Sequence, residues 1–272
     1  MQERDLATWE DFEAELRALR DRREARKGET ALHVSDLLFR GQHKASWTLT
    51  TTLERQGKGP LTLRQYYRLI CAAKPHIETL TGSRWDAPEY AEYERWLAEN
   101  ETGMPGGFPG YDYMVYLRHH GFPSPLLDWT RSPYVAAYFA FAHAIPAEGH
   151  VSIYAYWEYP GSGKGYSSNE PHIHGMGPYV RTHKRHFLQQ SEYTICLLHN
   201  KEWTYAAHEG AFARDDHTQD LLWKLNIPSA ERLKVLRLLD ERNINAFSLF
   251  GSEESLMETL SMRELHFRER GL

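Results

Sequence analysis

The longest apolar run of the chain constrains its fold most. It extends from Tyr134 to Ile145 and is interrupted by His143, so it is too short for the roughly 20 residues that a bilayer span needs. Ser132 and Pro133 precede the run, which places a cap and a proline at the first helical position. The sequence therefore predicts a buried helix over 134–144 and no membrane partner.

The composition is that of a folded protein with a sizeable core. Of 272 residues, 41% are hydrophobic and 25% are charged, which is close to the average of globular domains and argues against global disorder. The 32 Lys and Arg residues against 37 Asp and Glu residues give a net charge of −5. That balance argues against a surface that is wholly a nucleic-acid footprint, although it is compatible with a local basic stripe.

The cysteines and the N-terminus indicate the compartment. Cys71 and Cys196 are far apart and form no CxxC pair, so neither a disulfide framework nor a cysteine zinc site is indicated. The first five residues, 1–5, contain no apolar segment of the kind found in secretory signals. We therefore expect a cytoplasmic protein.

Periodicity and cap signals predict an α+β fold in one domain, with helices packed on a short, interrupted sheet. Besides the buried helix, helices are predicted over 8–27, 61–80, 87–101, 111–120, 229–243 and 252–262. Strands are predicted over 34–41, 151–157, 193–198, 203–207, 221–227 and 246–250. Loops are predicted over 103–110, 121–131 and 160–178.

Phe39-Arg40-Gly41-Gln42 is the first candidate for chemistry. An arginine at the end of a strand stands beside a glycine, which lets another backbone or a ligand come close. The planar guanidinium can bind phosphate oxygens through two hydrogen bonds at once. The alternative is a structural arginine that pairs with a buried carboxylate.

The second candidate is the segment 119–133, where polar and aromatic residues crowd between two helices. Asp128 follows two leucines and precedes Trp129, so its carboxylate is expected near apolar surface and needs a partner, for which Arg40 is a candidate. Thr130 or Ser132 could instead cap the next helix.

The third candidate is the start of the strand predicted at 193–198. Gln190 and Glu192, two residues apart, would point to one face and could hold one ligand, although an ordinary strand edge has the same pattern. Basic residues precede them at 183–186. A zinc site at His172 and His174 is not favoured because no third ligand follows at a suitable spacing. The segment 161–165 lacks the strand-to-helix setting of a phosphate loop.

Taken together, these motifs resemble the FRG domain family, which is named for its Phe-Arg-Gly motif. The resemblance implies an FRG domain over 36–262, with a helical extension over 1–35 and a tail over 263–272. Four residues depart from the family pattern, namely Arg118, Ser124, Pro125 and Ser191. The residues that carry the resemblance are 38–42, Trp47, Leu49, 119–121, 126–130, 132–133 and 136–140, and more loosely 189–194 and 243–250.

The order of the motifs also resembles that of the ADP-ribosyltransferases. This second resemblance implies a split sheet, NAD as the substrate, no metal, and Arg40, Thr130 and Glu192 as the catalytic residues. Arg40 would bind phosphate, Glu192 would hold the nicotinamide ribose, and Thr130 and Asp128 would shape the site. The residues expected to bind NAD are Arg40, Gly41, Gln42, His119, His120, Asp128, Trp129, Thr130 and Gln190.

We therefore expect an NAD-dependent ADP-ribosyltransferase, the toxin of a bacterial toxin–antitoxin or phage-defence system, with an antitoxin protein as a further partner. Its acceptor would be RNA or DNA, contacted by residues 183–186 and by the basic helix end over 17–27, or else a protein side chain. One alternative is a non-catalytic module that binds a nucleotide or a protein. Another is a metal-independent nuclease that uses His119, His120 and Asp128 for acid–base catalysis.

Overall fold

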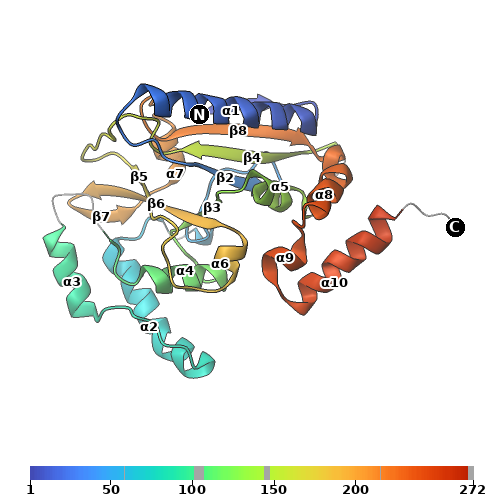
Figure 1. Cartoon of the computed structure of the whole chain (residues 1–272). Coiled ribbons are helices and arrows are strands. Elements are labelled where there is room, and N and C mark those ends of the chain that lie inside the picture. The colour runs from blue at the N-terminus through green and yellow to red at the C-terminus, as the bar shows by residue number, and fades with distance from the viewer. Residues whose placement is uncertain (58, 101–106, 144–147, 215, 269–272) are drawn as a thin grey trace.

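An eight-stranded mixed sheet organises the protein in the computed structural model, which describes residues 1–57, 59–100, 107–143, 148–214 and 216–268 (Figure 1). The strand order is β1-β8-β4-β2-β3-β6-β5, and β7 pairs with β6 outside this path. β1 pairs with β8 in parallel, and the other neighbours are antiparallel. The strands are β1 (Gln2–Asp5), β2 (Leu37–Gln42), β3 (Leu127–Thr130), β4 (His150–Trp157), β5 (His172–Gly175), β6 (Ser191–Asn200), β7 (Glu202–Tyr205) and β8 (Leu221–Pro228).

The sheet narrows at its centre. β2 pairs with β4 along its whole length, and β3 pairs with β6 along its whole length. Between β2 and β3, by contrast, Phe39 opposite Thr130 is the one register pair of these two fully described strands. The sheet thus consists of two halves that meet at a short junction, and the predicted α+β class is confirmed.

Three helices cover one face of the half formed by β1, β8, β4 and β2: α1 (Trp9–Glu29), α5 (Pro133–Phe141) and α8 (Arg232–Glu241). α1 begins at a capping box in which the Thr8 hydroxyl accepts from the Asp11 backbone N–H and the Asp11 carboxylate accepts from that of Thr8. α5 is almost entirely buried, as expected from its apolar sequence, and residue 144 of the predicted helix lies outside the described residues.

The other half of the sheet packs against α2 (Leu63–Thr81), α3 (Tyr90–Glu99) and α4 (Tyr111–His119). In Figure 1, α2 and α3 lie at the end of the molecule opposite α1. Tyr67 of α2 and Tyr93 of α3 stack with ring centroids 3.6 Å apart. This stack buries aromatic area in a core cluster that also contains residues of α4 and β6, and Arg118 of α4 binds Asp128 of β3.

A third core cluster joins the two halves on the opposite face of the central strands. Leu38 of β2, Trp129 of β3 and Tyr156 of β4 pack there with Phe212 of the short helix α7 (His208–Phe212). Successive side chains of β2 point to opposite faces of the sheet. Leu37 and Phe39 therefore belong to the core cluster beneath α1, α5 and α8, and Leu38 belongs to the third cluster.

The remaining elements are short. They are α6 (Arg185–Leu188), α9 (Ala246–Phe250), α10 (Glu253–Met262), the 3-10 turns at Glu54–Gln56 and Ser229–Glu231, and a π-helical turn at Arg263–Phe267. Figure 1 shows α9 and α10 extending from the body beside α6. Within the described residues, no helix is both long and apolar enough to cross a membrane.

Several sequence predictions were wrong. The strand predicted at 246–250 is the helix α9, because Asn245 and Ser248 form a capping box and Gly251 closes the helix in the left-handed conformation. The loop predicted at 121–131 contains β3, and the one at 160–178 contains β5. β1 was not predicted because all four of its residues are exposed and show no hydrophobic alternation. Residues 103–106 of the predicted loop lie outside the described residues.

Candidate functional site

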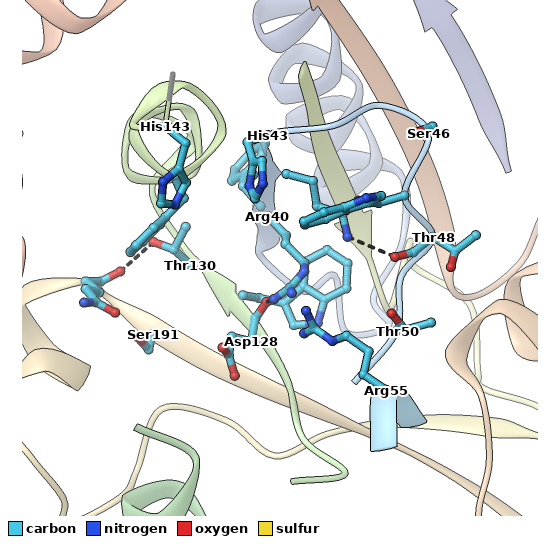
Figure 2. Close-up of a pocket in the computed structure, with 17 residues that line it drawn as sticks. Arg40, His43, Ser46, Thr48, Thr50, Arg55, Asp128, Thr130, His143 and Ser191 are labelled. Carbon is cyan, nitrogen blue, oxygen red and sulfur yellow. Dashed lines mark hydrogen bonds between the residues drawn. The ribbon is translucent and has the colours of Figure 1, made fainter. Parts of the chain in front are cut away.

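A cavity of about 570 Å³ opens where the two halves of the sheet separate. Its walls come from the end of β2, the segment that follows it, β3, α5 and the turn before β6 (Figure 2). The lining residues are Phe39–His43, Ser46, Trp47, Thr48, Thr50, Arg55, Asp128, Trp129, Thr130, Phe139, His143, Gln189 and Ser191.

The three residues Phe39, Arg40 and Gly41 have separate roles. Phe39 points into the core beneath α5, whereas Arg40 lies in the centre of the cavity in Figure 2. Gly41 packs directly on α5, where a Cβ atom would lie 1.9 Å from the Ala136 carbonyl oxygen. This glycine therefore allows the backbone of α5 to approach β2 closely.

The Arg40 guanidinium bridges the junction of the sheet. Its Nη1 donates to the Asp128 backbone oxygen at 2.7 Å, and its Nε is buried without a hydrogen-bond partner. Burial lowers the pKa of Arg40 to about 10, an effect that Asp128 opposes and that Arg118 and Arg55 reinforce. Arg40 nevertheless stays charged at neutral pH.

The carboxylate of Asp128 pairs with Arg118. The expected pairing of this carboxylate with Arg40 is wrong. Arg118 of α4 donates from Nε to Oδ1 at 2.9 Å and from Nη2 to Oδ2 at 2.5 Å. This bidentate pair neutralises the one carboxylate that lines the cavity. Arg118 is one of the positions that depart from the FRG pattern.

Arg55 brings a second guanidinium to the cavity. Its Nε donates to the Thr51 carbonyl oxygen at 3.3 Å. Neither Arg55 nor Arg40 forms an ion pair with a carboxylate of the described residues. The cavity is therefore positively charged, and Arg55 was not predicted because no local motif marks it.

Aromatic and imidazole rings form the upper wall of the cavity in Figure 2. The ring centroid of His43 lies 4.4 Å from that of Trp47 and 4.8 Å from that of His143. Burial is the main cause that lowers the pKa of His43, and His143 and Lys44 lower it further. Sequence analysis did not select these two histidines, since His43 lies just beyond the strand motif and His143 interrupts the apolar run that predicts α5.

The Thr130 hydroxyl is engaged in local structure. It donates to the Gln189 carbonyl oxygen at 2.7 Å and accepts from the Ser132 backbone N–H at 3.1 Å. Ser132 caps α5, as one alternative predicted. Thr130 and its register partner Ser191 both line the cavity, and they fix the turn before β6 against the start of α5.

Glu192 and Gln190 flank Ser191 but are not among the residues that line the cavity. Glu192 lies opposite Trp129 in the β3–β6 register, and its Oε1 is 3.5 Å from the Nε of Arg131. Burial raises the pKa of Glu192, Arg131 lowers it, and Asp36 and Glu158 raise it further. The structure thus brings Arg40, Gly41, Gln42, Asp128, Trp129 and Thr130 together, without Gln190 and Glu192.

His119 and His120 also lie outside the cavity lining. His119 Nε2 is 2.7 Å from the Tyr193 hydroxyl, which is 3.2 Å from Nδ1 of His186. Burial lowers the pKa of His119 to about 4. The ring of His120 packs on Tyr116. The acid–base set considered for a nuclease therefore does not converge on this cavity.

The basic segments predicted to contact nucleic acid are largely used within the fold. Arg23 binds Asp36 and the Ser35 carbonyl oxygen, and Arg26 donates to the Pro160 carbonyl oxygen at 3.2 Å. Lys184 donates to the Gly251 carbonyl oxygen, and Arg185 lies over the Phe250 ring. These side chains attach α1 and α9 to the rest of the molecule.

Two other motifs have local roles. Lys164, from the glycine-rich segment 161–165, is buried between Glu158 at 2.9 Å and Asp220 at 2.8 Å. His172 Nε2 contacts the Ser167 carbonyl oxygen at 2.8 Å. Within the described residues, no group of three or more His, Cys, Asp and Glu side chains could hold a metal ion.

Comparison with known proteins supports the first of the two family resemblances. The family model for the FRG domain matches residues 35–148. This segment contains β2, Arg55, Arg118, β3 and α5, and so most of the cavity wall. No curated protein and no solved structure matches the chain. The longer domain boundary, 36–262, and the flanking segments 1–35 and 263–272 stay predictions, and residues 269–272 lie outside the described residues.

Proposed function

We propose that the cavity binds NAD through its phosphates and that the protein transfers ADP-ribose from it. One observation carries the proposal: Arg40 and Arg55 line the same cavity, and neither forms an ion pair with a carboxylate of the described residues. The buried charge of Arg40 needs a counter-charge, and a pyrophosphate would supply one to Arg40 and also to the exposed Arg55. The volume, about 570 Å³, is in the usual range for small-molecule sites.

The cavity offers groups for the other parts of such a ligand. Nη1 of Arg40 is held by the Asp128 backbone oxygen, which leaves Nη2 to donate to phosphate oxygens. Trp47 provides an aromatic face for a base. The hydroxyl groups of Ser46, Thr48 and Thr50 can donate to ribose oxygens.

The transfer step requires stabilisation of positive charge at the ribose. When the bond between nicotinamide and ribose breaks, its electron pair leaves with nicotinamide and the ribose carbon becomes oxocarbenium-like. In our proposal Glu192 provides the stabilising carboxylate, and Arg40 fixes the phosphates so that the ribose is oriented. Glu192 follows Ser191, which lines the cavity, and its carboxylate lies 3.5 Å from Nε of Arg131.

Incubation with labelled NAD and cell lysate tests this proposal. We expect label transfer by the wild type, at least tenfold less transfer by Arg55→Met, and loss of transfer in Glu192→Gln, which keeps the side-chain shape. Arg84→Met removes an exposed guanidinium outside the cavity lining and is the matched control. Transfer by Glu192→Gln at the wild-type rate would remove Glu192 from the mechanism.

The second candidate function is nucleotide binding without catalysis. It is favoured by the position of Glu192, which pairs with Arg131 and is not part of the cavity lining. Under this alternative, NAD binds in an Arg55-dependent manner but nicotinamide is never released. Measurement of free nicotinamide in the same incubation separates the two functions.

We further propose that the protein acts as a toxin in the bacterial cytoplasm and is neutralised by an antitoxin protein. The acceptor of ADP-ribose would be RNA, DNA or a protein. This part of the proposal follows from the FRG resemblance and predicts growth arrest when the chain is expressed, with rescue by a neighbouring gene. Arrest that persists in Glu192→Gln would show that toxicity does not depend on ADP-ribose transfer.

A further inference from the structure

Two imidazole rings from different elements meet in the cavity beside the guanidinium groups. His43 follows β2 and His143 follows α5, and their ring centroids are 4.8 Å apart with an angle of 57° between the rings. Trp47 packs edge-on against His43 at 4.4 Å. Figure 2 shows both imidazoles above Arg40. Packing thus holds a pair of hydrogen-bonding rings next to the proposed phosphate site.

The charged groups around this pair are almost all positive. Lys44 lies over the Trp47 ring at 5.5 Å, and Arg40 and Arg55 line the same cavity. The one lining carboxylate, Asp128, is neutralised by Arg118. No carboxylate of the described residues forms an ion pair with either histidine. In the free protein burial, and then His143 and Lys44, disfavour the imidazolium form of His43.

We propose that His43 and His143 bind phosphate oxygens of the ligand that Arg40 holds, and that the pair takes up a proton when this ligand binds. The inference rests on the proposed nucleotide site but not on the transfer reaction. A phosphate anion supplies the negative charge that the surrounding residues lack, so it stabilises imidazolium and turns a ring nitrogen from acceptor to donor. The cavity is therefore a proton-coupled pyrophosphate site.

The coupling has a defined direction. The ligand raises the pKa of His43, and by linkage a lower pH must raise the affinity for the ligand. Between the pKa of His43 in the free protein and that in the complex, the dissociation constant changes by up to about tenfold per pH unit for each proton taken up. Binding should therefore strengthen from pH 8.5 to pH 6.

Isothermal titration calorimetry with ADP-ribose tests the proposal on the full chain. The pyrophosphate of ADP-ribose stays fully ionised between pH 6 and pH 8.5, so protons taken up must enter the protein. Titrations in buffers of different ionisation enthalpy count these protons. We expect uptake near pH 7 and at least fivefold tighter binding at pH 6 than at pH 8.5. In His43→Gln/His143→Gln, proton uptake and the pH dependence should both disappear.

His33→Gln is the matched control, because His33 is exposed and outside the cavity lining, and it should behave as wild type. Binding without proton uptake, or uptake that persists in the double variant, would overturn the inference. No binding of ADP-ribose at any pH would overturn it together with the proposed nucleotide site. Proton-coupled binding by a protein that releases no nicotinamide would support the inference and remove only the transfer activity.

Discussion

At the scale of single residues, Gly41 has the least space for a side chain among the described glycines. A Cβ atom there would lie 1.9 Å from the Ala136 carbonyl oxygen and 2.7 Å from the Ala140 backbone nitrogen. Gly41→Ala must therefore push α5 away from β2, and we expect a loss of about 1–3 kcal/mol in the free energy of unfolding. Chemical denaturation measures it.

Gly28 is the matched control for that substitution. It lies inside α1, where an added Cβ would meet nothing within 4 Å. Gly28→Ala should leave stability unchanged or raise it by up to about 1 kcal/mol, because alanine favours helix. Equal effects of the two substitutions would contradict the packing role assigned to Gly41.

Glu192 gives a prediction that concerns stability alone. Burial raises its pKa in the folded state, so the favourable protonated form is lost as pH rises through that pKa, and the ionised carboxylate lowers stability at neutral pH. We expect Glu192→Gln to be more stable than wild type at pH 7 and equal to it near pH 3. Urea denaturation at the two pH values tests this. Lower stability of the variant at pH 7 would mean that the Arg131 ion pair outweighs burial.

At the scale of elements, the sequence predicted most helices because their ends carry local signals. Thr8 and Ser132 cap α1 and α5 in the structure as they do in the sequence pattern. Short elements lack such signals. β3 has four residues and lies in a segment rich in turn residues, and β1 is a strand only because β8 pairs with it. These two segments are strands because they pair with β8 and β6, which are distant in sequence. Local sequence patterns do not reveal such pairing.

Lys164 controls the placement of the segment before β5. Its ammonium group is buried with Glu158 and Asp220 and also donates to the Ile173 carbonyl oxygen at 2.6 Å. Lys164→Met would leave two carboxylates without their cation, and we expect a loss of about 3–5 kcal/mol at pH 7. Lys27→Met, at the exposed end of α1, should change stability by less than about 0.5 kcal/mol.

The effect of Lys164→Met should depend on pH. Burial raises the pKa of Asp220 even with Lys164 present, and removal of the cation raises it further. Protonation then relieves the unpaired charge, so the stability difference between variant and wild type should shrink as pH falls from 7 towards 4. A difference that is constant over this range would contradict the role of charge.

At the scale of the whole molecule, the sheet junction places the cavity. Arg40 and Asp128 are 88 positions apart in sequence, and the family resemblance predicted that their segments belong to one site. That resemblance did not predict Arg55 and His143. The tertiary fold brings these two residues to the cavity. The resemblance also grouped Glu192, Gln190, His119 and His120 with the site, whereas these four residues are not among those that line the cavity.

A ligand bound between the two halves should stabilise the whole fold. Binding to the folded state alone adds about 2.7 kcal/mol when the ligand is present at about 100 times its dissociation constant. We expect ADP-ribose to raise the melting temperature of the wild type, and to raise it much less in Arg55→Met. An equal rise in both proteins would place the ligand away from Arg55.

The most direct test of the account is a crystal structure of the protein with ADP-ribose. We expect the pyrophosphate in the cavity at the β2–β3 junction, with its oxygens within hydrogen-bond distance of Arg40 and Arg55. The ligand bound at another surface, with this cavity empty, would contradict the assignment of the site.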